Sequence, residues 1–95
     1  MAQENLVDLI LNDYDSFVEY HKENSDLDIS EADFSHQNFE NADFSNIDFS
    51  GTSFQESNLA NINFTDCDLT SVDFSRATIS ECDFSGAILN GASFN

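Results

Sequence analysis

The chain has 95 residues, of which 19 are Asp or Glu and two are Lys or Arg, giving a formal net charge of -17. So few cations exclude direct binding to nucleic acid, where Lys and Arg must displace counterions from phosphates, and binding to an anionic membrane. The length leaves room for one domain, and ten Phe and two Tyr indicate a folded chain, unlike disordered acidic segments.

Residues 1–26 carry a helical pattern. Apolar side chains recur at helix spacing, and three more widen the apolar side: Val7, Ile10, Leu11, Tyr14, Phe17, Val18, then Leu6, Leu9, Tyr20. Asn24 and Ser25 are expected to end the helix. The first residues are acidic where a signal peptide is basic, and no apolar run approaches about 18 residues, which predicts a cytoplasmic protein. We expect the helix to cap the following domain, with a partner or dimer surface as the alternative.

A period of five begins after this helix. A large apolar residue returns at every fifth position: Ile29, Phe34, Phe39, Phe44, Phe49, Phe54, Leu59, Phe64, Leu69, Phe74, Ile79, Phe84, Leu89, Phe94. A second, mostly small or apolar series lies two residues earlier, from Leu27 to Ala92, and a polar residue, usually Asp or Asn, stands between the two series. This alternation is typical of a strand, and the two polar residues after each unit turn the chain.

The period fits neither an α-helix nor a flat strand. In a helix, successive Phe residues would rotate by about 500° and spread around the cylinder. In a strand, an odd period would send alternate Phe residues to opposite faces. A corner after every unit removes both objections, because the chain then coils with every Phe pointing at a common axis.

Units such as Ala32-Asp33-Phe34 and Val72-Asp73-Phe74 resemble those of the pentapeptide-repeat family, whose unit is A(D/N)Lxx. The resemblance covers residues 27–95 without a slip in register, with Phe preferred to Leu at the centre. It implies an all-β solenoid, a right-handed quadrilateral β-helix with four pentapeptides per coil and about 3.5 coils. We therefore divide the chain into an N-terminal helix and cap at 1–26 and a pentapeptide-repeat β-helix at 27–95.

Four units per coil bring residues twenty apart onto one face. Inside, this predicts two columns of rings: Phe34, Phe54, Phe74, Phe94, and Phe44, Phe64, Phe84. Outside, it predicts acidic columns on three faces: Asp28, Asp48, Asp68; Asp33, Asp73; and Asp43, Asp83. The fourth face, with Asn38, Asn58 and Thr78, has no acid at that position.

The charge density of the coil is close to that of DNA. Residues 27–95 hold twelve acids and one Arg, a net charge of -11. At a strand spacing of about 4.8 Å they span roughly 17 Å of axis, or about 0.65 charge per Å. Duplex DNA carries roughly 0.6 charge per Å.

Several members of the pentapeptide-repeat family, which this sequence resembles, mimic duplex DNA and inhibit DNA-handling proteins, notably DNA gyrase. The resemblance thus implies a DNA mimic on the DNA-binding surface of a basic protein: a topoisomerase such as gyrase, or a nuclease or phage-defence complex. Asp28, Asp48 and Asp68 would be the leading contacts, supported by Asp33, Asp43, Asp73 and Asp83. Two alternatives stay open. The Asp residues could serve only to form turns and to keep the protein soluble. The chain could also be a scaffold or regulatory interaction module without DNA mimicry.

The last twelve residues, after Asp83, carry no charge. Ile88 takes an outward position at which its column elsewhere has Asp, and Phe94 belongs to the last coil. We therefore expect two chains to join end to end near Ile88, Leu89 and Phe94 as a symmetric homodimer.

The sequence has no pattern typical of an enzyme. Its Ser and Asp residues recur with the repeat, His21 and His36 stand apart, and the three glycines form no phosphate-binding loop. Cys67 and Cys82 fall at inward positions on different faces, which predicts buried free thiols rather than a disulfide or metal site. We therefore expect a non-enzymatic binding protein without cofactor or metal.

Overall fold

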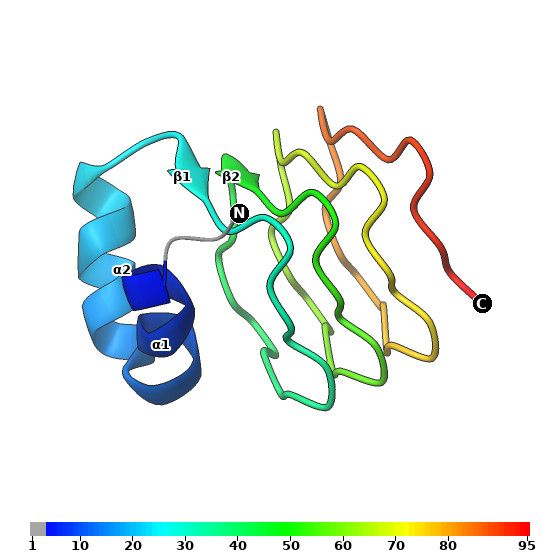
Figure 1. The fold of residues 1–95 in the computed structure, drawn as a ribbon, viewed down its shortest axis with the longest axis horizontal. Coiled ribbons are helices and arrows are strands. Elements are labelled where there is room, and N and C mark those ends of the chain that lie inside the picture. The colour runs from blue at the N-terminus through cyan, green and yellow to red at the C-terminus, as the bar shows by residue number, and fades with distance from the viewer. Residues whose placement is uncertain (1–3) are drawn as a thin grey trace.

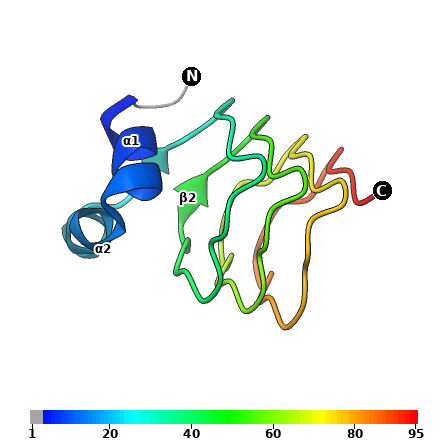
Figure 2. The same cartoon turned by 90° about the horizontal axis from the view of Figure 1, so that it is seen from below.

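The computed structural model describes residues 4–95 (Figure 1). Two helices at the N-terminal end are followed by a chain that winds in successive turns along the long axis of the molecule (Figures 1 and 2). The principal extents are 32 × 24 × 22 Å. Two short strands, β1 (Leu27–Asp28) and β2 (Ile47–Asp48), pair in parallel at the start of the coil.

The N-terminal segment forms two helices, α1 (Glu4–Asn12) and α2 (Tyr14–Glu23), so the prediction of one helix was wrong. The break falls at Asp13, whose backbone is not helical, with φ -150° and ψ 67°. Its carboxylate accepts hydrogen bonds from the Ser16 backbone N–H at 3.3 Å and hydroxyl at 2.7 Å. Asp13 therefore caps α2 and starts a new helix where the apolar pattern would have allowed one to continue. As expected, α2 ends with Asn24 at its C-cap.

Both helices pack on the first turn of the coil. Leu6, Ile10 and Phe17 are buried in the same apolar cluster as the coil interior, and the Phe17 ring lies 6.3 Å from that of Phe44. The Tyr14 hydroxyl accepts from the Asp43 backbone N–H at 3.1 Å. Leu11 and Tyr20, which the sequence places on the apolar side, are 38% and 40% exposed, because two separate helices do not share one continuous face.

The coil repeats every twenty residues. Its parallel bridges join residues of that separation, from Asp33 with Ser53 and Asn38 with Asn58 to Asp73 with Ser93. Phe34 N–H donates to Ser53 C=O at 2.8 Å, and Ser53 N–H donates to Ala32 C=O at 2.9 Å. Twenty residues are four repeat units, so each turn has four faces.

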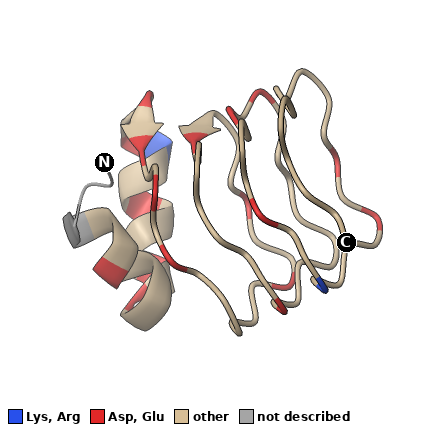
Figure 3. Cartoon of the chain, turned by 45° about the vertical axis from the view of Figure 1, so that its right-hand side comes forward, with Lys and Arg blue, Asp and Glu red and all other residues tan. Residues whose placement is uncertain are grey.

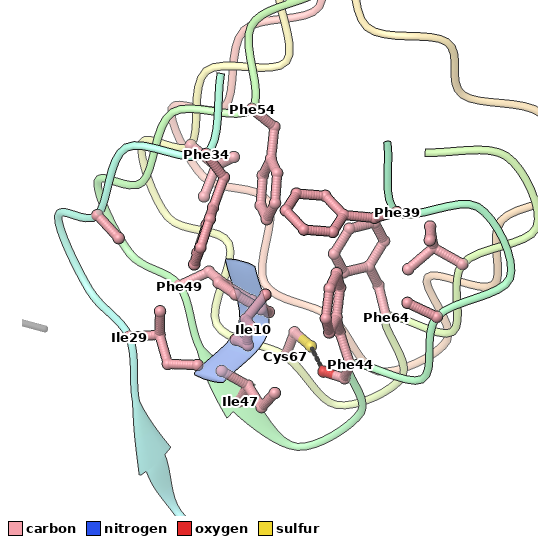
Figure 4. Close-up of a cluster of buried hydrophobic side chains, with 14 of the residues drawn as sticks. Ile10, Ile29, Phe34, Phe39, Phe44, Ile47, Phe49, Phe54, Phe64 and Cys67 are labelled. Carbon is pink, nitrogen blue, oxygen red and sulfur yellow. Dashed lines mark hydrogen bonds between the residues drawn. The ribbon is translucent and has the colours of Figure 1, made fainter. Parts of the chain in front are cut away.

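Phenylalanine rings fill the interior (Figure 4). The predicted column is confirmed: ring centroids are 5.6 Å apart for Phe34 and Phe54, 5.7 Å for Phe54 and Phe74, and 5.0 Å for Phe74 and Phe94. Phe44, Phe64 and Phe84 form the second column. Rings of neighbouring columns meet edge to face, as for Phe44 and Phe49 at 5.4 Å, a geometry that aromatic pairs favour.

One residue in every five has a left-handed backbone. These corner residues run from Asp26 to Gly91 and have φ between 57° and 74°. All three glycines, Gly51, Gly86 and Gly91, are corner residues, and they adopt this conformation without a Cβ clash. The corner turns the chain from one face to the next.

Small polar side chains at inward positions bond to the preceding turn. The Thr52 hydroxyl donates to Ile29 C=O and that of Ser57 to Phe34 C=O, both at 2.7 Å. The thiol of Cys67 contacts Phe44 C=O at 2.9 Å (Figure 4). Both cysteines are free, as predicted, although Cys82 is only half-buried. Burial raises the pKa of the Cys67 thiol to about 12, so it stays protonated at neutral pH.

Candidate partner-binding surface

The structure brings together the leading acidic column of the sequence prediction. Asp28 pairs in register with Asp48, and Asp48 with Asp68, on three successive turns. Ile88 follows on the next turn. Neighbouring strands lie about 4.8 Å apart, so the three carboxylates form a ladder on one face.

The other two acidic columns are interrupted. Ser53 lies between Asp33 and Asp73, and Asn63 lies between Asp43 and Asp83. Members of each pair are therefore two strand spacings apart, and their mutual repulsion is weaker than in the Asp28 column. The fourth column contains Asn38, Asn58 and Thr78, in register and without a carboxylate.

Two further acids, which the sequence analysis did not select, flank the leading column. Asp26 and Asp66 occupy corners, each with φ 57°, and line a shallow depression of about 280 Å³ with Asp48 and Asp68. No Lys, Arg or His lines it. The signal in the sequence was the Asp-x-Asp spacing of residues 26–28 and 66–68. We call Asp26, Asp28, Asp48, Asp66 and Asp68 the acidic strip; Figure 3 shows the acidic positions along the coil.

Every column Asp closes a turn with its own side chain. Asp28 accepts from Ser30 N–H and Asp48 from Ser50 N–H, both at 2.9 Å. Asp68 accepts from the N–H of Thr70 at 3.0 Å and from its hydroxyl at 2.6 Å. The other predicted partner-binding residues each accept a hydrogen bond from the backbone N–H two residues later in the chain: Asp33, Asp43, Asp73, Asp83.

At four of these turns the hydrogen bonds keep the carboxylate ionised. The Ser30 hydroxyl and N–H lower the pKa of Asp28 below its ordinary value. Ser35, Ser75 and Ser85 do the same for their partners, Asp33, Asp73 and Asp83. A lowered pKa means that the stabilisation is complete at neutral pH and is lost as the pH falls through the folded-state pKa.

Asparagine performs the same structural task without charge. Asn38 accepts from Glu40 N–H at 3.1 Å, Asn58 from Ala60 N–H at 3.1 Å, and Asn63 from Thr65 N–H at 2.9 Å. The turn therefore needs a side-chain oxygen and does not need a carboxylate. Turn formation explains why Asp or Asn stands at these positions, but not why most of them are Asp.

The two basic residues pair elsewhere. Arg76 lies 3.8 Å from Glu56 at a corner, where His36 also approaches Glu56 at 3.5 Å. Lys22 lies on α2, 3.9 Å from Glu19. Within residues 4–95 no group of three or more His, Cys, Asp or Glu side chains is arranged to hold a metal ion. No helix in the same range is long and apolar enough to cross a membrane.

The residues predicted for a dimer contact lie on the last turn, at the C-terminal end of the coil (Figure 1). Ile88, Leu89 and Phe94 are 49%, 37% and 53% exposed. They are the largest apolar side chains exposed on the coil, since the other two in the described chain are Leu11 and Tyr20 on the helices.

A coil of five-residue units with a Phe-filled interior and side-chain-capped turns defines a β-solenoid. The chain belongs to the pentapeptide-repeat family, since the model of the pentapeptide repeat region matches residues 23–94. Proteins of this family fold as right-handed quadrilateral β-helices and are generally not enzymes. The boundary predicted at 26/27 remains a prediction.

Solved structures of the family resemble the chain. The pentapeptide repeat protein Rfr23 of the cyanobacterium Cyanothece 51142 matches with a TM-score of 0.69 and 17% identity, over 73% of this chain and 48% of that one. A pentapeptide repeat protein of the Arabidopsis thaliana thylakoid lumen matches with a TM-score of 0.52 and 26% identity, over 72% and 58%. The chain thus spans about half the length of these relatives. No curated protein matches it.

Proposed function

We propose that this chain is a non-catalytic DNA mimic that occupies the DNA-binding surface of a basic protein and inhibits it. The observation that carries the proposal is the surplus of charge on the acidic strip. Asn38, Asn58 and Asn63 close turns of the same kind elsewhere in the coil. The turns at Asp28, Asp48 and Asp68 therefore need a side-chain oxygen but not its charge. A ladder of unneeded like charges raises the energy of the free protein, and a cationic partner surface offsets that cost.

The charge density of the whole molecule supports the proposal. A net charge of -17 on a long axis of 32 Å gives 17/32, or about 0.5 charge per Å. The first three residues carry no charged side chain, so they do not affect the count. Duplex DNA carries roughly 0.6 charge per Å. The target class is a topoisomerase such as DNA gyrase, or a nuclease or phage-defence complex.

A scaffold or regulatory interaction module is the second candidate. Two surfaces favour it: the exposed apolar side chains of the last turn, and a groove of about 410 Å³ where the helices meet the coil. The groove is lined by Ile10, Leu11, Tyr14 and Phe39 together with the polar Gln37, Asn38 and Glu40. Such surfaces recognise partners through burial of apolar area, which salt affects little.

The two functions separate in a competition pull-down from bacterial lysate. The chain is immobilised and bound proteins are challenged with duplex DNA. The triple variant Asp28→Asn, Asp48→Asn, Asp68→Asn keeps the turn bonds and removes the column charge. The triple variant Glu40→Gln, Glu56→Gln, Glu81→Gln removes as much charge from other parts of the coil and is the matched control.

Mimicry predicts a captured DNA-binding protein that duplex DNA releases, that the Asn variant fails to retain, and that the Gln variant still holds. Its binding should weaken steeply between low and physiological salt. A captured protein that is indifferent to DNA and equally bound by the Asn variant would instead establish the scaffold function.

A further inference from the structure

Each turn of the coil bonds to the preceding turn through its outward residues, as Ser53 does at 2.9 Å with Ala32 C=O and at 2.8 Å with Phe34 N–H. Before the first turn, residues 27–46, the chain forms α1 and α2 instead of another turn (Figure 1). A helix side chain supplies a partner on one face, where Asp43 N–H donates to the Tyr14 hydroxyl at 3.1 Å. The outward residues of the first turn therefore need partners from outside the coil.

The face of Asn38 has no such partner. Within residues 4–95, the backbone N–H and C=O of Asn38 and the C=O of Glu40 make no hydrogen bond. On the next face, the carbonyl equivalent to that of Glu40 is Ser45 C=O, which contacts His21 Nε2 at 2.7 Å. Asn38 and Glu40 line the groove of about 410 Å³ between the helices and the coil, which we call the helix–coil groove. One backbone donor and two backbone acceptors therefore lie at this groove.

Two apolar side chains of the groove are incompletely covered. Phe39 is 7% exposed, whereas Phe34 and Phe44 of the same turn are fully buried. Leu11, on the helix side of the groove, is 38% exposed. An apolar side chain of a ligand that packs against both removes apolar surface from water, which favours its binding.

The unit at residues 37–41 departs from the repeat at this groove. Gln37 takes an inward position that elsewhere holds small or apolar side chains, and it is exposed. Glu40 is the only acid at its position of the repeat, which is most often Ser. Folding of the coil explains neither residue, since the other units form their turns without them. No Lys, Arg or His lines the groove, so Glu40 favours a cationic group in a ligand.

We propose that the helix–coil groove binds an extended segment of a partner protein, in which apolar and basic side chains alternate. The segment adds a strand to the coil and lies parallel to the strand of Asn38, in the place of a preceding turn. Its first apolar residue accepts from Asn38 N–H, its second donates to Asn38 C=O, and the residue two further on donates to Glu40 C=O. Ala32, Phe34 and His36 bond to the next turn in the same way.

The alternation follows from the two sides of the added strand. Successive side chains of a strand point to opposite faces. The apolar side chains of the segment take the inward positions and contact Leu11 and Phe39. Its basic side chains take the outward positions, and the second of them lies over Glu40, whose charge it balances.

The helix–coil groove is distinct from the acidic strip. Asn38 lies two units from Asp28, so the two residues are on opposite faces of the four-sided coil. No residue of the strip lines the groove. The inference therefore does not rest on the proposed DNA mimicry, and it gives the scaffold candidate a mode of recognition.

A titration of the full, isotope-labelled chain followed by NMR tests the proposal with the peptide acetyl-Ser-Val-Lys-Leu-Lys-Ser-amide. The amide signals of Asn38, Phe39 and Glu40 should shift most, and hydrogen exchange of the Asn38 N–H should slow, because this group gains a hydrogen bond. The same peptide with an N-methylated Leu cannot donate to Asn38 C=O and should bind roughly three- to tenfold more weakly. The peptide acetyl-Ser-Lys-Lys-Val-Leu-Ser-amide has the same charge without the alternation and should bind at least about tenfold more weakly.

Variants of the chain test the two walls of the groove. Leu11→Ala removes apolar contact and Glu40→Gln removes the charge, and each should weaken binding of the alternating peptide roughly threefold or more. Tyr20→Ala, at an exposed side chain of α2, and Glu81→Gln, at a corner of the last turn, are the matched controls. Both should bind within about twofold of the parent, because neither residue lines the groove.

Three results would overturn the proposal. Equal affinity for the alternating and the rearranged peptide would show that charge alone attracts them. Shifts confined to Asp28, Asp48 and Asp68 would place the peptide on the acidic strip. Shifts at Asn38 that depend on protein concentration without any peptide would assign the groove to a second copy of the chain.

Discussion

Four polar side chains lie at inward positions of the coil, and each gives its single proton to a carbonyl of the preceding turn. They are Thr52, Ser57, Cys67 and Cys82, whose contacts to carbonyl oxygens measure 2.7 to 2.9 Å. Thr52 and Ser57 also accept a backbone N–H, from Ala32 and Gln37. Such residues satisfy buried backbone groups, so they stabilise an interior that would otherwise consist of apolar side chains alone.

Replacing Thr52 by Val should destabilise the protein by about 1–3 kcal/mol. The two side chains have nearly the same shape, but Val leaves Ile29 C=O and Ala32 N–H without their partner in a buried position. Urea unfolding at neutral pH measures the change. Thr78→Val, at an exposed outward position, is the control and should stay within about 0.5 kcal/mol of the parent. Equal losses in the two variants would contradict this role of Thr52.

At this scale the sequence predicted positions better than contacts. The five-residue period placed Phe34, Phe54 and Phe74 above one another, as the structure has them. It did not reveal the left-handed corners, although the three glycines all fall at the same place in the period. Glu31, Ser71 and Arg76 hold the same conformation without being glycine, so residue identity alone gives a weak signal for it. Gln37, assigned to the inward series, is exposed because its long polar side chain reaches solvent at the first turn.

Two short helices, rather than one, pack against the first turn of the coil. Apolar residues are so dense between Leu6 and Tyr20 that several helical faces fit the pattern. Asp13 decides between them by capping α2, which is a local hydrogen-bond choice that periodicity does not report. The sequence could therefore predict helical structure here, but not its division or the burial of Phe17 against Phe44.

Replacing Phe17 by Ala should cost about 3–5 kcal/mol of stability. Its ring is fully buried and contacts Tyr14, His21 and Phe44, so the variant leaves a cavity between α2 and the coil. Chemical denaturation measures the loss, and amide hydrogen exchange should report faster opening of residues 27–46. Tyr20→Ala removes an exposed ring of the same helix and should change stability by no more than about 0.5 kcal/mol. A small effect of Phe17→Ala would mean that the helices and the coil unfold independently.

Across the whole molecule, repulsion between like charges works against the fold. The Asp28 column places three carboxylates on adjacent strands, and its turn bonds hold them there. The sequence predicted this column correctly, because stacking at a separation of twenty follows from the repeat alone. It missed Asp26 and Asp66, because the corner position had not been assigned to an outward face.

Raising NaCl from about 0.02 to about 0.5 M at neutral pH should stabilise the protein, because the Debye length falls from about 20 Å to about 4 Å. Thermal unfolding at several salt concentrations measures the effect. The triple variant Asp28→Asn, Asp48→Asn, Asp68→Asn should be more stable than the parent at low salt and respond less to added salt. An unchanged salt response would show that repulsion within this column contributes little.

The separation of twenty residues between paired positions also limits how such a coil can change its length. Duplication of a whole block of twenty residues would lengthen it and keep every column in line. Insertion of a single unit of five would preserve the interior, yet it would rotate everything downstream by a quarter turn. Asp68 would then leave the column of Asp28 and Asp48 for a neighbouring side. The surface charge pattern is therefore set by the number of units between two acids, so lineages can redirect it without altering any residue that packs inside.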